Sequence, residues 1–299
     1  MCGIVGFTGR ENALPILIKG LYSLEYRGYD SAGIAAFTRD GLRVVKTQGR
    51  ISNLEEKIQE EGGLDCTCGI GHTRWATHGE PSDRNSHPHL GGRDGKGKVA
   101  VVHNGIIENY KDLRESLEAH GYTFQSETDT ETVAHLVDYL HTGKQEDLAQ
   151  TVLSAVQRIR GSYALGVVSM DNPEEIVAAR RDNPLVIGIG EGENMIASDI
   201  TAIISRTKKY IILDDNEVAI VRPDSVVVMN EFGDVVEKAV QTVNWDLSAA
   251  EKGGYQHFML KEIMEQPKAV ADTVKPRIQN NAVCFEDNGL TDDRLREIE

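Results

Sequence analysis

C-G-I-V-G-F, residues 2 to 7, is the stretch of this chain that decides its fold and its chemistry. Its apolar residues between two glycines predict a short buried strand that follows directly on a cysteine. A helix is expected next, from near Glu11, with an apolar face at helical spacing formed by Leu14, Leu17, Leu21 and Leu24. The chain therefore begins with a strand that carries Cys2 at its start.

Helices and strands are partly segregated along the rest of the chain. Helices are predicted around 130–141 and 146–159, whereas residues 162–240 contain many short Val- and Ile-rich strands separated by turns. This segregation predicts the α+β class, with sheets packed face to face and helices outside them.

A domain boundary is expected near residue 240, where the strand pattern ends. A polar stretch then leads to a predicted helix over 255–273, which Pro276 stops. We therefore expect one domain over 1–240, followed over 241–299 by a linker and the start of a second domain. That second domain looks truncated, because roughly fifty residues rarely form a stable core of their own.

The charge of the chain argues against polyanionic partners. Lys and Arg number 32, Asp and Glu number 47, and the net charge is −15. No run of basic residues is dense enough to follow a phosphate backbone. Apolar segments are too short for a signal peptide or a membrane span. We therefore expect a cytoplasmic protein that binds neither nucleic acid nor membranes.

Cys2 is a candidate nucleophile. Removal of Met1 would place a free α-amine on the same residue as the thiol. The ordinary pKa of such an amine, about 7.7 to 8.0, lies close to the thiol value of about 8.5, so the amine could activate the sulfur near neutral pH. The alternative is that Cys2 is only a small apolar residue of an edge strand.

Asn104 and Gly105 follow a predicted buried strand over 99–103. A side-chain amide and a backbone N–H at this point could stabilise an oxyanion beside the nucleophile. The alternative is an ordinary Asn-Gly turn.

Arg74 and Asp129 are candidates for holding an α-carboxylate and an α-amine. Arg74 lies where a predicted strand gives way to loop, with Thr77 and His78 as neighbouring donors, and a guanidinium can bind a carboxylate with two hydrogen bonds. An exposed salt bridge is the alternative for Arg74. Asp129 could face a ligand, or it could simply be a first-turn acid of a helix capped by T-D-T-E, residues 128 to 131.

Several other side chains are not expected to form a metal site. Cys66, Cys68 and His72 lack a fourth ligand and the usual zinc spacing, so we expect no metal, and the two cysteines are interpreted as core residues on one face of a strand. His87 and His89 lie in a polar loop and are expected to be solvated or structural.

Short motifs along the chain together carry a family resemblance. They are C-G-I-V-G at 2–6, L-E-Y-R-G-Y-D-S-A-G at 24–33, H-T-R-W-A-T-H-G at 72–79, H-N-G-I-I-E-N at 103–109 and S-E-T-D-T-E at 126–131. In this order they resemble the glucosamine-6-phosphate synthase family, also called glutamine–fructose-6-phosphate aminotransferase. The resemblance implies a class II glutamine amidotransferase domain with the four-layer αββα fold of N-terminal-nucleophile (Ntn) hydrolases. H-F-M-L-K-E-I-M-E-Q-P at 257–267 resembles the start of that family's sugar isomerase (SIS) domain.

The resemblance also implies roles for the candidate residues. Cys2 would form a γ-glutamyl thioester, and Arg27 would support its surroundings. Trp75 would gate an ammonia channel, although a packed aromatic side chain is the alternative from the residues alone. Asn104 and the Gly105 amide would stabilise the oxyanion. Arg74, Thr77 and His78 would hold the glutamine carboxylate, and Asp129 would hold its amine.

The implied activity is glutaminase, an amidotransferase half-reaction in amino-sugar biosynthesis. L-glutamine would give glutamate and ammonia without a cofactor. Fructose 6-phosphate would be aminated to glucosamine 6-phosphate only by the isomerase half, whose active site these residues lack, and the full-length enzyme would be a homodimer. The alternatives are an amidophosphoribosyltransferase-like glutaminase, which fits R-W-A-T-H-G and N-G-I-I-E-N less well, and a glutamine-binding regulatory fragment without turnover.

Overall fold

Most of the chain forms two antiparallel sheets with helices on their outer faces. The computed structural model describes residues 2–28, 30–76, 79–93, 97–141, 147–244, 254–255, 258–279, 282–283 and 292–296. Contacts divide the chain into two compact units, residues 1–244 and 245–299.

The first sheet contains the strand predicted at the start of the chain, and all six residues of this strand are buried. Its strands are, in spatial order, β15 (Gln241–Thr242), β11 (Lys209–Ile212), β9 (Val186–Ile189), β10 (Asn194–Ala197), β1 (Gly3–Thr8), β4 (Cys68–Arg74), β2 (Ser31–Thr38) and β3 (Gly41–Gln48). Their pairings are antiparallel. β1 lies inside the sheet between β4 and β10, and Cys2, just before β1, stands next to the end of β4.

The second sheet supplies the opposite half of the core. Its strands are, in spatial order, β14 (Val235–Val236), β13 (Ser225–Met229), β12 (Val218–Arg222), β8 (Asn172–Arg181), β7 (Gly161–Ser169), β6 (Val99–Ile107) and β5 (His89–Leu90). These pairings are antiparallel as well.

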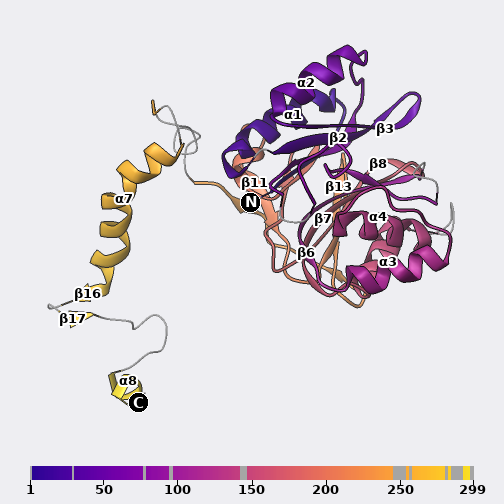
Figure 1. The fold of residues 1–299 in the computed structure, drawn as a ribbon. Coiled ribbons are helices and arrows are strands. Elements are labelled where there is room, and N and C mark those ends of the chain that lie inside the picture. The colour runs from indigo at the N-terminus through magenta and orange to yellow at the C-terminus, as the bar shows by residue number, and fades with distance from the viewer. Residues whose placement is uncertain are drawn as a thin grey trace. The chain divides into compact units, whose positions relative to one another are not determined.

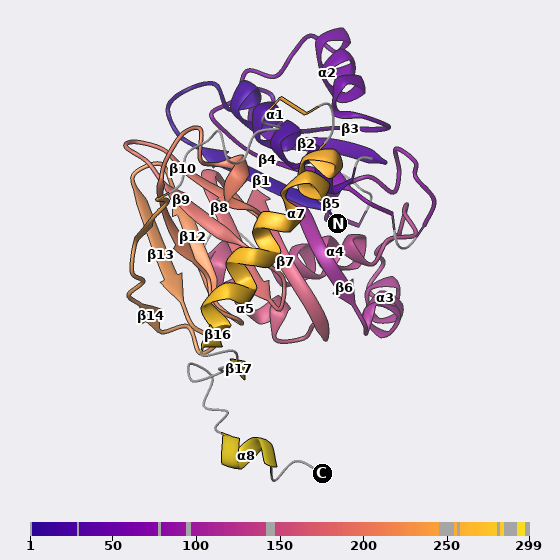
Figure 2. The same cartoon turned by 90° about the vertical axis from the view of Figure 1, so that its left-hand side faces the viewer.

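Helices cover the outer face of each sheet (Figures 1 and 2). On the first sheet lie α1 (Ala13–Leu24) and α2 (Ile51–Glu60), with the short 3-10 turns η1 (Glu25–Arg27) and η2 (Ile200–Ala202). On the second lie α3 (Tyr110–Ala119), α4 (Asp129–Leu140) and α5 (Leu148–Val156). The helix predicted from near Glu11 starts two residues later, because Asn12 accepts the Leu14 N–H at 3.0 Å and caps it.

Alternation along the strands builds three apolar layers. Ile4 of β1 and Val102 of β6 belong to the cluster between the sheets. Their neighbours Val5 and Val101 belong to the clusters under the helices of their own sheet. The predicted α+β class with an αββα layer order is therefore confirmed.

One helix was not predicted, and one predicted strand is longer than expected. No helix was expected at α3, and its pattern is weak because Leu117 is the only buried residue among its ten. The predicted strand over 99–103 continues to Ile107, since Gly105 pairs with Tyr163 of β7. The alternative of an ordinary Asn-Gly turn is therefore wrong.

The second unit, residues 245–299, contains α7 (Phe258–Val274), η3 (Lys275–Arg277), the two-stranded pair β16 (Ile278–Gln279) and β17 (Ala282–Val283), and α8 (Asp292–Arg296). Its main helix ends just before Pro276, as the sequence predicts. Within the described residues, none of the helices combines the length and the apolar character that crossing a bilayer requires.

Candidate active site

Cys2 immediately precedes β1. It lines a pocket together with His103 and Gly105 of β6, a strand of the second sheet. The sulfur contacts Trp75, which follows the neighbouring strand β4. The Trp75 N–H donates to Sγ at 3.3 Å, and the thiol lies 3.6 Å from the Trp75 carbonyl oxygen. The backbone of Trp75, just after the end of β4, thus holds the nucleophile candidate in place.

The surroundings of Cys2 favour the protonated thiol. Burial raises the pKa of this group above its ordinary value, and the hydrogen bond from the Trp75 N–H only partly opposes the increase. A sulfur in this state attacks an amide slowly near neutral pH. Cys2 therefore needs a base if it is to act as a nucleophile.

Asn104 and Gly105 come from β6 of the opposite sheet. The Asn104 Nδ2 donates to the backbone carbonyl of Cys2 at 3.2 Å, which links the two sheets at the nucleophile candidate. Gly105 has φ +136°, and a Cβ at this position would overlap the Ser162 carbonyl oxygen. The side-chain amide therefore lies beside Cys2 because β6 continues through this point and does not turn there.

A pocket lies beside Cys2. Its walls come from the ends of β1, β4 and β6 and from the first turn of α4. Its described lining residues are Cys2, Arg74, Trp75, His87, His103, Gly105, Thr128, Asp129 and Thr130. The structure thus brings a thiol, a guanidinium and a carboxylate together from segments that are far apart in sequence.

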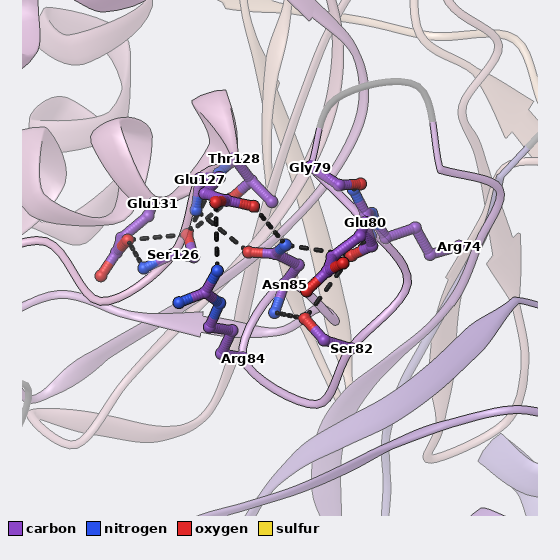
Figure 3. Close-up of polar contacts among 10 residues, drawn as sticks. All are labelled: Arg74, Gly79, Glu80, Ser82, Arg84, Asn85, Ser126, Glu127, Thr128 and Glu131. Carbon is purple, nitrogen blue, oxygen red and sulfur yellow. Dashed lines mark hydrogen bonds and ion pairs between the residues drawn. The ribbon is translucent and has the colours of Figure 1, made fainter.

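Arg74 is the buried cation of this pocket, with 4% of its surface exposed. Its guanidinium donates to the carbonyl oxygens of Gly79 at 3.1 Å and Glu80 at 3.4 Å (Figure 3). The alternative of an exposed salt bridge is therefore wrong. Thr77 and His78, the neighbouring donors in the prediction, lie outside the described residues.

Asp129 stands at the first position of α4 and lines the pocket. Its Oδ2 accepts the Ile107 N–H at 2.8 Å, so the end of β6 and the start of α4 are joined at this carboxylate. Asp129 is thus both a first-turn acid and a group that faces the pocket, which were the two predicted alternatives.

The predicted capping box is wrong. Thr128 does not cap α4 with its side chain, because its hydroxyl lies 2.9 Å from both Ser126 Oγ and His89 Nε2. Glu131 accepts instead from the N–H groups of Gln125 and Ser126. Burial opposes ionisation, but these bonds and the nearby His135 lower the pKa of Glu131 to about 2.

Asn85 connects the loop after β4 to the segment before α4. Figure 3 shows its carboxamide between the two: Nδ2 donates to the Glu80 carbonyl oxygen at 3.0 Å and to Glu127 Oε2 at 3.1 Å. Oδ1 accepts the Glu127 N–H at 3.0 Å, and Arg84 pairs with the same carboxylate. The loop that receives the Arg74 hydrogen bonds is thereby fixed to the chain segment that leads to Asp129. Asn85 was not among the predicted site residues.

Four buried imidazoles form a histidine cluster beside the pocket: His72, His87, His89 and His103. The rings of His72 and His87 stack with centroids 4.2 Å apart, and His89 meets His87 edge-on at 5.0 Å. Burial lowers the pKa of each imidazole, that of His72 to about 3, so all four are neutral at pH 7. His87 and His89 are therefore not solvated, and no spacing in the sequence indicates that these four residues lie together.

Arg27 and Trp75 both interact with the amino-terminal segment, Arg27 through Ser198 and Trp75 by direct contact with Cys2. Arg27 donates to the Ser198 carbonyl oxygen at 3.3 Å and pairs with Asp199 at 3.6 Å. Ser198 in turn bonds the backbone of Ile4, so Arg27 reaches the Cys2 strand indirectly. Trp75 is 56% exposed and is not a packed core aromatic.

Asp30 and Gly28 hold the segment around Trp75 and were not predicted. Asp30 donates its N–H to the Arg74 carbonyl oxygen at 3.0 Å, and its carboxylate accepts the Ala76 N–H. The Trp75 ring lies against Gly28, where a Cβ would overlap it.

Cys66 and Cys68 are core residues, but they do not share a face as predicted. Cys66 precedes β4 and packs under α1 and α2, whereas Cys68 lies between the sheets. The alternation rule failed because Cys66 is not part of the strand. Across the described part of the chain, no group of His, Cys, Asp or Glu has the arrangement of a metal site.

Comparison with known proteins connects this geometry to a family. Residues 72–205 match the glutamine amidotransferase domain family. The whole chain is 52% identical to a glutamine–fructose-6-phosphate aminotransferase (isomerizing) of Caldanaerobacter subterraneus subsp. tengcongensis, 48% of which is covered. The enzyme with that name from Methanosarcina acetivorans is 46% identical, with 49% covered. The chain thus spans about half the length of the curated relatives it matches.

Solved structures share the fold. A glutamine phosphoribosylpyrophosphate amidotransferase from B. subtilis, complexed with ADP and GMP, is 29% identical with a TM-score of 0.64, covering 78% of this chain and 50% of that chain. The higher identity to the aminotransferases confirms the predicted resemblance to glucosamine-6-phosphate synthases. Residues 72–205 are thus similar to a glutamine amidotransferase domain, the chain has the class II, N-terminal-nucleophile fold, and over its whole length it is similar to about half of a glutamine–fructose-6-phosphate aminotransferase.

Proposed function

We propose that this chain hydrolyses L-glutamine to glutamate and ammonia with Cys2 as the nucleophile. The observation that carries the proposal is the convergence of Cys2, Arg74 and Asp129 on one pocket within the amidotransferase fold, with the Asn104 amide bonded to Cys2. A thiol, an amide donor, a cation and an acid are the groups that acyl transfer from a free amino acid requires.

The first half-reaction forms a thioester. Removal of Met1 frees the α-amine of Cys2, which accepts the thiol proton while Sγ attacks the side-chain amide carbon of glutamine. An amide NH2 has two hydrogens, so Asn104 Nδ2 can keep its bond to Cys2 and donate the second to the oxyanion, together with the Gly105 N–H. The amine then gives the proton to the leaving nitrogen, which departs as ammonia.

The second half-reaction restores the enzyme. The same amine takes a proton from a water molecule, and the resulting hydroxide adds to the thioester carbonyl. Collapse of the intermediate breaks the C–S bond, glutamate leaves, and the sulfur regains its proton. The nucleophile and the base are then as they were before the reaction.

Substrate orientation follows from the two charges of the pocket. The Arg74 guanidinium binds the glutamine carboxylate, assisted by Thr77 and His78, and Asp129 binds the α-amine. Arg27 supports the Cys2 strand through Ser198, and the exposed Trp75 closes the pocket over the ammonia. With these roles, each candidate residue has a proposed part in binding or hydrolysing glutamine.

The use of the ammonia in a second reaction would be a property of the full-length protein. The matched relatives are named for fructose 6-phosphate, so we propose that ammonia made here aminates that sugar phosphate to glucosamine 6-phosphate in a cytoplasmic homodimer. Residues 1–240 would be the glutaminase domain and 241–299 the linker and the start of the isomerase domain.

The direct test is glutamate release by the purified chain, measured alongside the intact mass of its amino terminus. We expect turnover only in molecules that have lost Met1. Turnover by a protein that retains Met1 would refute the amine as base. Glutamine binding without any glutamate release by the processed protein would indicate a binding module and refute the hydrolase proposal.

A further inference from the structure

We infer that His72 is a positioning residue that fixes the orientation of the Asn104 carboxamide, so that the NH2 end of this amide faces Cys2. The inference rests on the proposed function, because it concerns the amide donor of that reaction. It adds a buried residue of β4 that does not line the pocket.

The hydrogen-bond geometry at His72 permits one tautomer. His72 Nε2 lies 3.0 Å from Asn104 Oδ1 and 3.1 Å from the His103 carbonyl oxygen. Both oxygens are acceptors, so Nε2 must carry the hydrogen. The ring is neutral because burial lowers its pKa to about 3. Its Nδ1 is then an acceptor, and it has no hydrogen-bond partner among the described residues.

This donor decides which end of the amide faces the sulfur. The oxygen and the NH2 group of a carboxamide are nearly equal in size, so packing alone distinguishes them poorly. A hydrogen bond from His72 holds Oδ1 on the histidine side and leaves Nδ2 toward the Cys2 carbonyl, 3.2 Å away. In the flipped orientation two donors would meet at His72, and an oxygen would face both the Cys2 carbonyl and the developing oxyanion.

The imidazole of His72 cannot readily turn away from this position. Its side chain is fully buried and stacks on His87 at 4.2 Å with 26° between the ring planes. His87 is itself tied to β6, since its Nδ1 accepts the His103 N–H at 3.4 Å. The donor is therefore held in place before glutamine binds, which is the condition for an effect on the transition state.

A matched set of variants tests the inference. His72→Leu removes the donor, whereas His72→Gln keeps an N–H near the place of Nε2. Removing a donor from an oxyanion site costs about 10²- to 10³-fold in kcat. We expect His72→Leu to lower kcat by roughly 10- to 100-fold, with KM for glutamine within about twofold, and His72→Gln to recover most of the loss.

Two further measurements separate positioning from general damage. The rate of Cys2 alkylation by iodoacetamide needs no oxyanion donor and should not change in His72→Leu. In an Asn104→Ala background, His72→Leu should add almost nothing, because its effect passes through the amide that is already lost. His72→Met, whose flexible side chain adapts to irregular space, replaces the leucine variant if that variant does not fold.

The outcomes separate this inference from the proposed function. Full kcat in a folded His72→Leu or His72→Met protein would overturn the inference and leave the glutaminase proposal intact. Additive losses in the double variant, or equal losses in the leucine and glutamine variants, would also overturn it by indicating a structural role. An inactive processed wild type would refute the function itself.

Discussion

The two sides of Asn104 are built in opposite ways. On one side, Cys2 is held by backbone groups of Trp75, a residue that is more than half exposed. On the other side, the histidine cluster is buried, and the His87 ring contacts the rings of His72 and His89. The comparison teaches that the partly buried nucleophile candidate adjoins an exposed residue, whereas the groups that orient the amide are enclosed and neutral.

The largest effect should come from the exposed side. Cys2→Ala removes the nucleophile, and we expect glutamate release to fall by about 10⁴-fold or more, with little change in melting temperature because Cys2 precedes the strand and fills little of the core. Glutaminase activity and thermal unfolding of the processed variant measure both. Measurable turnover would remove Cys2 from the mechanism.

Blocking the amine should have the next largest effect. An alanine inserted between Met1 and Cys2 leaves the thiol in place but converts its amine into an amide. We expect kcat to fall by roughly 10²- to 10⁴-fold, the usual contribution of a positioned base. The matched control is an alanine inserted after Asp40, in the turn between β2 and β3. We expect the glutaminase activity of this control to be unchanged.

Arg74→Ala should act on binding more than on chemistry. Loss of the guanidinium leaves a carboxylate unpaired, which costs about 2 to 5 kcal/mol and raises KM by tens- to thousands-fold. Arg84→Ala is the matched control, because that arginine is half exposed and pairs with Glu127 outside the pocket lining. An unchanged KM for Arg74→Ala would contradict its assignment.

The histidine cluster should make stability depend on pH. Its imidazoles stay neutral in the folded protein because burial lowers their pKa, whereas the unfolded chain protonates them near pH 6.5. Unfolding below pH 6.5 therefore takes up protons, and the free energy of unfolding falls as pH falls, by about 1.4 kcal/mol per pH unit for each histidine.

Urea unfolding at pH 7.5 and pH 5.5 tests this slope. We expect a clearly lower midpoint at pH 5.5, and a smaller difference in His89→Gln, which removes one titrating group. Equal midpoints at the two pH values would show that the four imidazoles are not neutral in the folded protein.

The sequence predicted the layers because their cause is local. The continuous apolar run around Ile4 is typical of a strand buried on both faces, and the helical spacing of Leu17 and Leu21 gives the helix one buried face. Cys2 and Asp129 were identified for a similar reason, since each stands at the start of an element. Only the family resemblance connected them before the structure placed both in one pocket.

What the sequence did not reveal depends on contacts between distant segments. The capping box around Thr128 fits the local rule, but His89 and Ser126 take its hydroxyl. The Asn104-Gly105 turn fits too, but pairing with β7 extends the strand. His72 lies in β4 and His87 in the loop before β5, and no repeat in the sequence indicates that their rings stack. Local patterns therefore failed where side chains of several segments compete for one partner.

The bond between Asn104 and Cys2 joins the two sheets, and this has a mechanical consequence. The separation of these residues is set by the thickness of the apolar layer between the sheets, where Ile4 and Val102 lie close to them in sequence. That layer acts as a spacer for the reacting groups. A smaller apolar residue at Val102 would shift the Asn104 amide relative to the Cys2 sulfur, although it changes neither group. Such a substitution would therefore lower the rate of glutamine turnover.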